Sequence, residues 1–177
     1  MRTAIMFALV ACSNARDTPP DATRGAIASD ASTSDGAKSA PSDASTGPLR
    51  LIVLNEVVAA GDPDWFEIVN ATTAPLDTSQ FVFVDKAGAF DKAVPFTLGT
   101  IGPGAFATVD CDGSAVPFKL GSDEELWIYR GSDHVLSDGV DWAAGDSPDG
   151  GSYARIPDTF GPFTTTLHPT KGTPNQP

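Results

Sequence analysis

Aspartates gather in two places of the sequence where oxygen ligands could meet a cation. The stretch DCDGS puts Asp110 and Asp112 at alternate positions, and Asp141, Asp146 and Asp149 lie in or just before a glycine-rich stretch. Carboxylates on loops are ligands that Ca²⁺ accepts, but the glycine and the bidentate glutamate of an EF-hand loop are missing here. The pattern allows weak calcium binding, and its alternative is that aspartate and glycine simply form turns.

Other residue types that support catalysis lack the necessary spacing. His134 and His168 form neither an H-x-x-H nor an H-E-x-x-H arrangement, so a transition-metal site is not expected. Ser147 is followed by proline, and the G-x-S-x-G turn of serine hydrolases is absent. We therefore expect a protein that is not an enzyme and needs no cofactor. A secreted calcium-dependent hydrolase, or an accessory domain of one, is the alternative.

The stretch DWFEIVNATTAPLD raises the question of whether Glu67 is a catalytic acid or a structural residue of a β-strand. In a strand over residues 65–70, successive side chains point to opposite faces of the sheet. Phe66 and Ile68 share one face, which we expect to be the core. Glu67 then points outward or toward an edge, and we expect Glu67 and Asn70 to hold neighbouring turns by hydrogen bonds.

The same alternation in residues 125–131 places Leu126 and Ile128 in the core. Trp127 and Tyr129 lie on the opposite face. If that face is open to solvent, these two aromatic residues are the best candidate contact patch, because aromatic side chains are enriched in interfaces.

Composition limits the class of partner. The chain has 177 residues, a formal net charge of -12 and a pI of about 4.2. Such an acidic surface repels phosphate backbones, so nucleic acid is not an expected partner. The sequence has two cysteines, too few for a disulfide framework, and we expect Cys111 to be a small, buried, reduced residue.

The N-terminus combines a basic start, a short apolar stretch and a cysteine. The sequence LVAC ending at Cys12 resembles the lipobox of bacterial lipoproteins, in which the cysteine carries lipid. The resemblance implies a signal peptide over residues 1–11 and a membrane anchor at Cys12. It also implies a place in the cell envelope, at the outer membrane or cell surface of a Gram-negative bacterium. The alternative is an ordinary signal peptide with a chance cysteine.

Residues 12–48 follow as a linker rich in serine, alanine, aspartate, threonine, glycine and proline. This composition predicts disorder, because the segment has too little apolar surface to offset the entropy of ordering.

From residue 49 onward, short apolar or alternating runs recur between turn residues, which is typical of an all-β sandwich or barrel. No segment has a helical stripe over three turns. Eight short strands are predicted, over residues 49–58, 65–70, 81–85, 95–98, 105–110, 125–131, 134–142 and 152–156.

Residues 49–175 resemble the lamin tail domain, an immunoglobulin-like β-sandwich. The resemblance lies in LIVLNEVVA, DWFEIVNATTAPLDTSQFVFVD, LGTIGPGAFATV, FKLGSDEELWIYRGSDHVLSDGVDW and the closing GSYARIPDTFGPFTTTLHPTKGTPN. It implies one such domain over residues 49–177. It also implies a non-catalytic role as a monomer in adhesion, envelope scaffolding or binding of a protein or surface polymer. The residues that it marks as structural are Asn55, Glu56, Trp65, Glu67, Asn70, Asp85 and Arg155.

Overall fold

The computed structural model describes residues 47–177, which form eleven β-strands and two 3₁₀ turns. Three of the strands have only two residues each, which leaves eight strands of four residues or more. The strands are β1 (Ile52–Val58), β2 (Asp64–Asn70), β3 (Leu76–Asp77), β4 (Phe81–Val84), β5 (Val94–Pro95), β6 (Thr100–Ile101), β7 (Phe106–Cys111), β8 (Glu124–Arg130), β9 (Leu136–Trp142), β10 (Ser152–Arg155) and β11 (Phe163–Thr166), and the turns are η1 (Thr78–Gln80) and η2 (Phe90–Lys92).

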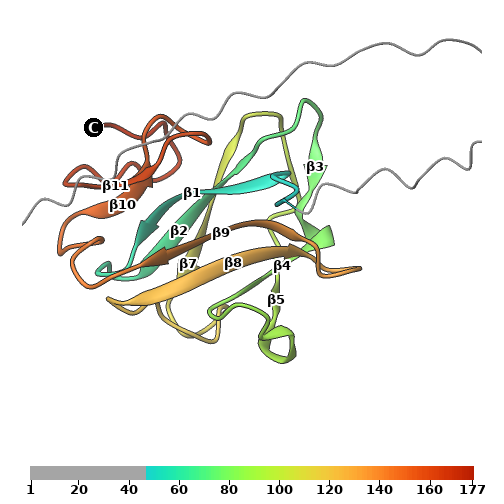
Figure 1. Cartoon of the computed structure of the whole chain (residues 1–177), viewed down its shortest axis with the longest axis horizontal. Helices are drawn as coiled ribbons and strands as arrows, with labels where there is room; N and C mark the ends of the chain where they lie inside the picture. Colours follow the sequence, from blue (N-terminus) through green and yellow to red (C-terminus); the bar gives the residue numbers. More distant parts are fainter. Residues whose placement is uncertain (1–46) are drawn as a thin grey trace, which may run out of the picture. The chain divides into compact units, whose positions relative to one another are not determined.

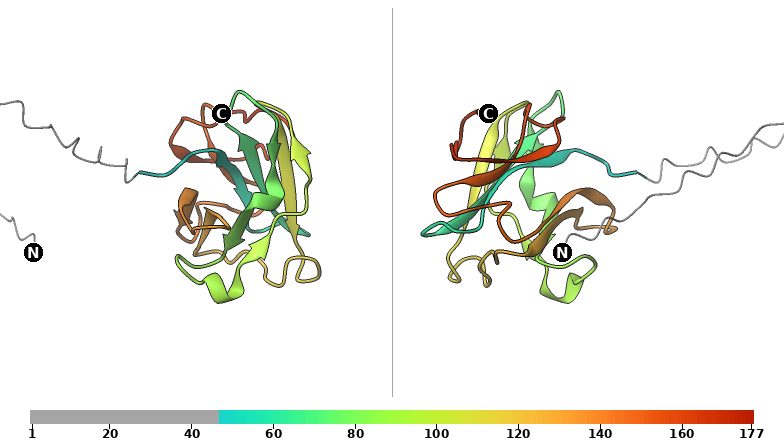
Figure 2. Two further views of the ribbon diagram at one scale, coloured as in Figure 1. Left: turned by 90° about the vertical axis from the view of Figure 1, so that its right-hand side faces the viewer. Right: turned by 60° about the vertical axis from the view of Figure 1, so that its left-hand side comes forward.

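Two antiparallel sheets face each other and enclose the core (Figures 1 and 2). One has the strand order β11-β10-β1-β2-β7, the other has the order β5-β4-β8-β9, and β3 pairs with β6 as a small separate ribbon. The ring of Phe66 in β2 meets the ring of Phe83 in β4 edge to face at 5.1 Å, so the layers interlock through aromatic side chains. The predicted all-β sandwich is confirmed.

The predicted strands agree with the structure except near residues 95–98. There only Val94 and Pro95 form a strand beside β4. The Phe96 amide still donates to the Phe81 carbonyl at 3.2 Å, and the Phe96 side chain is buried in the core. Strand β11 was not predicted, because its threonine-rich run has the polarity of a loop. Its pairing with β10 supplies the eighth longer strand.

The four side chains predicted for the core are all buried. Phe66, Ile68, Leu126 and Ile128 are each 0% exposed and belong to one apolar cluster. Burial of side chains of this size contributes about 1.5–3 kcal/mol each to folding. The alternation along β2 and β8 therefore predicted correctly which face of each sheet meets the other.

Glu67 lies on the outer face of its strand, as the alternation predicts, but that face is not open to solvent. Its side chain points away from the core, but it is 0% exposed because the chain after β11 returns across the outer face of β1 and β2. We call residues 167–177 the C-terminal segment. The alternation of a strand reports which face a side chain is on, and it cannot report whether a remote segment covers that face.

The signal peptide over residues 1–11, the lipidation site at Cys12 and the linker as far as residue 46 lie outside the described residues. The amides of Leu49 and Arg50 donate to the carbonyls of Leu136 and Ser137 in β9, so the domain is already engaged at residue 49. Within residues 47–177, no helix is long and apolar enough to cross a membrane.

Candidate binding surfaces

A bulge in β1 brings Asn55 into a buried polar cluster. The pairing of β1 with β2 skips one residue between Leu54 and Glu56, which leaves Asn55 as the extra residue. Its side-chain Nδ2 donates to Glu67 Oε1 at 3.1 Å and to Asp158 Oδ1 at 2.9 Å. The bulge thus links β2 to the loop between β10 and β11.

Glu56 fixes the C-terminal segment to the sheet. Its carboxylate accepts hydrogen bonds from the Thr170 amide at 3.1 Å, the Thr170 hydroxyl at 3.0 Å and the Ser152 hydroxyl at 2.5 Å. Glu56 is 0% exposed, so these donors replace the water that its charge would otherwise attract. Its role in this geometry is structural.

Glu67 completes the attachment of the C-terminal segment. Its Oε2 accepts a hydrogen bond from the amide of Gly172 at 2.6 Å. Burial raises the pKa of Glu67 to about 7, a rise that the hydrogen bonds from Asn55 and Gly172 oppose and that the nearby charges of Glu56 and Asp158 increase. A carboxyl group with a pKa near neutrality resembles a catalytic acid, but both oxygens of Glu67 are occupied by donors of the protein itself.

Arg155 and Asn175 join the last strands to β1. The guanidinium of Arg155 donates to the Leu54 carbonyl at 2.8 Å and pairs with Asp138 at 3.0 Å. The amide group of Asn175 donates to the carbonyls of Asn55 at 3.0 Å and Arg155 at 2.9 Å. Asp138 and Asn175, which the sequence analysis did not single out, are therefore members of the same cluster.

The remaining residues marked by the lamin tail resemblance lie around this cluster or in the other sheet. Asn70 donates to the carbonyls of Ala74 and Ile101 at 2.8 and 3.0 Å and so holds the turn after β2. Trp65 is buried beneath the ammonium group of Lys171, which lies 5.4 Å from its ring centre. Asp85 is half-buried just beyond the end of β4, in the opposite sheet.

The predicted contact patch is only partly available. Tyr129 is 9% exposed, because Phe90 of η2 packs edge to face against it at 4.9 Å. Trp127 is half-buried and lies on Gly139, where an added Cβ would come within 2.0 Å of the indole. The patch therefore fails at Tyr129, since the loop between β4 and β5 covers it.

The aspartates considered as calcium ligands are spread over separate local contacts. Asp110 pairs with Lys171, Asp112 accepts hydrogen bonds from the amide and hydroxyl of Ser114, and Asp146 accepts from the Ala143 amide. Asp141 and Asp149 are both exposed. Within residues 47–177, no group of three or more histidine, cysteine, aspartate or glutamate side chains could hold a metal ion.

Ser147 and Cys111 are buried. The Ser147 hydroxyl accepts from the Ala59 amide at 2.9 Å and donates to the Val57 carbonyl at 3.2 Å, so it bridges two backbone groups. Cys111 is a free thiol at 0% exposure, and burial, reinforced by the charge of Asp64, raises its pKa to about 12. Its predicted burial is confirmed. A thiol with so high a pKa is a poor nucleophile.

A cavity lined by apolar residues together with two threonines and two aspartates opens between the edges of the two sheets, at β5 and β7. Its volume is about 410 Å³, within the range of ligand pockets. Asp110 and Asp112 stand among the residues that line it. The apolar residues of the lining are Phe83, Phe96 and Val116, which are buried, Val94, Leu98 and Val109, which are half-buried, and Pro95 and Ala115, which are exposed.

No local sequence pattern predicts this cavity, because its walls come from strands that are distant in sequence. Phe160 and Leu167, at 82% and 69%, are the large hydrophobic residues of the described part that stay exposed. Exposed apolar residues of this kind occur on most protein surfaces.

Comparisons of the chain with protein-family models, curated proteins and solved structures found no match. The resemblance to the lamin tail domain therefore rests on the sequence motifs.

Proposed function

We propose that this chain is a lipid-anchored protein of the bacterial cell envelope, in which a lamin-tail-like β-sandwich serves as a non-catalytic protein-binding module. In this proposal Cys12 carries the lipid, residues 13–48 separate the domain from the membrane, and residues 49–177 meet the partner. The partner is a protein of the envelope or of the cell surface.

The proposal that the domain is not catalytic is supported by the hydrogen bonds of its buried polar groups, which are made within the protein itself. Glu56, Glu67 and Asn55 each hold backbone or side-chain groups of the protein's own chain. No buried polar side-chain atom within residues 47–177 lacks a hydrogen-bond partner. A substrate would have to displace these bonds, and breaking them would expose the C-terminal segment and the bulge of β1.

Membrane anchoring is supported by the sequence alone. The apolar stretch before Cys12 is too short to span a bilayer, which needs roughly 20 residues. A single acyl chain binds membranes only marginally, so several chains on the cysteine would be needed for firm attachment.

The anchor is tested by expressing the full chain with Cys12→Ser and separating membranes from soluble material. We expect the native chain in the membrane fraction and the variant in the soluble fraction. Asn14→Ser, which changes a neighbouring residue and keeps the cysteine, should stay with the membranes. Retention of Cys12→Ser in the membrane fraction would show that the lipobox assignment is wrong.

The alternative, a calcium-dependent hydrolase, is tested with the soluble Cys12→Ser chain. Calorimetric titration with CaCl₂ and a panel of ester, peptide and glycoside substrates should show neither saturable binding below about 1 mM nor turnover. Calcium-dependent turnover that Asp110→Ala or Asp141→Ala abolishes would replace the binding-module proposal.

A further inference from the structure

The cavity between the two sheets lies at the open side of the sandwich, beside β7. We call this opening the mouth. Val109 points toward the core, since it stands opposite Phe66 in the pairing of β7 with β2. Even so, Val109 and its neighbour in this alternation, Ala107, are only half-buried. The inner face of β7 is therefore incompletely covered, and apolar side chains from outside could complete the core at this place.

The backbone of β7 is free on the side of this mouth. Within residues 47–177, β7 is the last strand of the five-stranded sheet and pairs only with β2. The amide of Asn70 donates to the carbonyl of Ala105, and antiparallel pairing alternates from there. The amides of Phe106, Thr108 and Asp110 therefore point away from β2. No backbone hydrogen bond within residues 47–177 engages these three amides.

The facing edge of the other sheet is closed to strand pairing. β5 has two residues, and Pro95 is one of them, so this edge is short and lacks a donor. β7 has six residues and no proline. An extended chain that enters the mouth can thus pair with β7 and cannot pair in the same way with β5.

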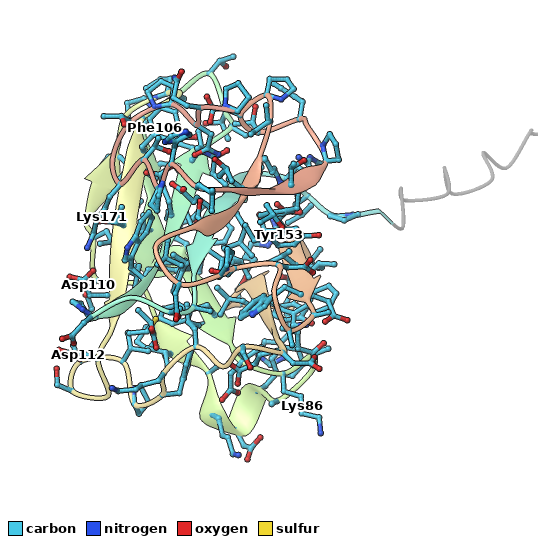
Figure 3. All side chains as sticks on the ribbon, turned by 90° about the vertical axis from the view of Figure 1, so that its left-hand side faces the viewer. Lys86, Phe106, Asp110, Asp112, Tyr153 and Lys171 are labelled. Carbon is cyan, nitrogen blue, oxygen red and sulfur yellow. The ribbon has the colours of Figure 1, made fainter. Side chains whose placement is uncertain are left out.

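Negative charge stands at one end of this edge. Figure 3 shows Phe106 at one end of β7 and Asp110 and Asp112 at the other, with Lys171 beside Asp110. Asp112 is exposed, and no ion pair within residues 47–177 includes it. The net charge of the whole chain is -12. A positively charged partner is attracted to this end of the strand, whereas a second copy of the same chain is repelled.

We propose that β7 binds an extended, basic peptide segment of a partner protein by strand addition, with alternate apolar side chains of the peptide filling the cavity between β5 and β7. The inference rests on the proposed protein-binding function and gives the chemistry of the partner. Hydrogen bonds to Phe106, Thr108 and Asp110 supply sequence-independent pairing. The cavity selects apolar side chains at every second position, and Asp112 selects lysine or arginine near one end of the segment.

The first test uses a labelled heptapeptide of alternating valine and lysine and the soluble Cys12→Ser chain. Fluorescence anisotropy should give saturable binding with a Kd below about 1 mM. The same peptide with glutamate in place of lysine should bind at least roughly tenfold more weakly, because it meets like charge. No saturable binding of the lysine peptide, or equal binding of both peptides, would refute the proposal.

Two substitutions at one position separate backbone pairing from side-chain effects. Thr108→Pro removes an outward amide and keeps all bonds to β2, so it should weaken binding by roughly tenfold or more. Thr108→Val keeps the amide and nearly the same side-chain shape, so its affinity should stay within roughly twofold. Asp112→Asn keeps the turn to Ser114 and should weaken binding several-fold, with a smaller dependence on salt. Equal affinity of Thr108→Pro and Thr108→Val would refute pairing at β7.

If Thr108→Pro fails to fold, amide hydrogen exchange along β7 in the chain without a Thr108 substitution tests the same pairing. Adding the lysine peptide should slow the exchange of the amides of Phe106, Thr108 and Asp110. The amides of Ala107 and Val109, which already donate to β2, should change little. If these outward amides exchange at the same rate with saturating peptide, the peptide does not pair with β7.

The failure of this proposal and the failure of the function are distinguishable. Membrane release of Cys12→Ser concerns the anchor and does not involve β7. If the anchor test succeeds and the peptide tests fail, the chain is still an envelope lipoprotein, but β7 is not its binding edge. If the anchor test fails and the peptide binds at β7, the edge site stands and the location is wrong.

Discussion

The outer face of β2 and the free edge of β7 are neighbours in one sheet, yet their polar groups have opposite roles. On the outer face of β2, Glu67 is 0% exposed and bonded to Asn55 and to the remote Gly172. On β7, Asp110 is exposed, and the outward amides have no partner within residues 47–177. A polar side chain that a remote segment covers stabilises the fold through its hydrogen bonds. A strand edge whose backbone amides lack hydrogen-bond partners, beside a cavity, is available to a partner.

The largest effect should come from breaking the covered region at Glu56. Glu56→Ala leaves the Thr170 amide, the Thr170 hydroxyl and the Ser152 hydroxyl without their acceptor, so we expect a loss of about 3–5 kcal/mol in the free energy of unfolding. Urea unfolding of the Cys12→Ser chain measures it. Thr108→Val on the open edge is the matched control and should stay within about 0.5 kcal/mol. Similar losses for both variants would erase the contrast between the two regions.

The pH dependence of stability should identify Glu67 as the titrating group of the covered region. Its pKa is about 7 in the folded protein against an ordinary 4.5, so the folded state binds more protons between these values. Stability from this group is complete below pH 4.5 and is lost as the pH rises through 7, an effect of roughly 3 kcal/mol.

Glu67→Gln cannot ionise and should lack this component. The stability difference between the parent and Glu67→Gln should therefore be largest near pH 4.5 and shrink toward pH 8, as thermal unfolding across this range measures. Asp123→Asn, at an exposed position, should follow the parent at every pH. A difference that is constant with pH would mean that Glu67 does not titrate in this range.

Cys111 tests how far the opening at β7 extends. It is the last residue of β7 but is 0% exposed, and burial raises its pKa to about 12. In the Cys12→Ser chain it is the remaining cysteine of the sequence. We expect DTNB to react at least roughly 100-fold more slowly with the native protein than with the urea-unfolded protein. Complete reaction within minutes in the native state would show that the mouth reaches the end of the strand.

The smallest effect is expected at Asp110. Its pair with Lys171 joins two half-exposed side chains at the surface, so Asp110→Asn should change the free energy of unfolding by less than about 1 kcal/mol. Urea unfolding at low and at high salt measures this change. A loss as large as that of Glu56→Ala would mean that the edge of β7 belongs to the covered region after all.

Local patterns in the sequence predicted most of the strands and the core. Alternation placed Phe66, Ile68, Leu126 and Ile128 correctly, because a side chain on a strand has only two directions to choose from. Patterns failed where a residue's own chemistry was misleading. Pro95 begins the run predicted as a strand over residues 95–98 but is the last residue of β5, and the threonines of β11 pair with β10 despite their polarity.

The candidate sites were predicted less well than the fold. The burial of Glu67 and Tyr129 depends on the C-terminal segment and on Phe90, and the cavity beside β7 depends on side chains from several strands. These contacts join residues far apart in the chain, so no local pattern records them.

The sequence by itself determined the class of fold, the apolar faces of the strands, the acidic character of the chain and the motif at Cys12, because these follow from composition and short-range periodicity. Only the tertiary structure decided which polar residues are covered and which edge stays open. Covering a face requires a remote segment to cross it, and an edge is free only if no other strand of the chain has paired with it.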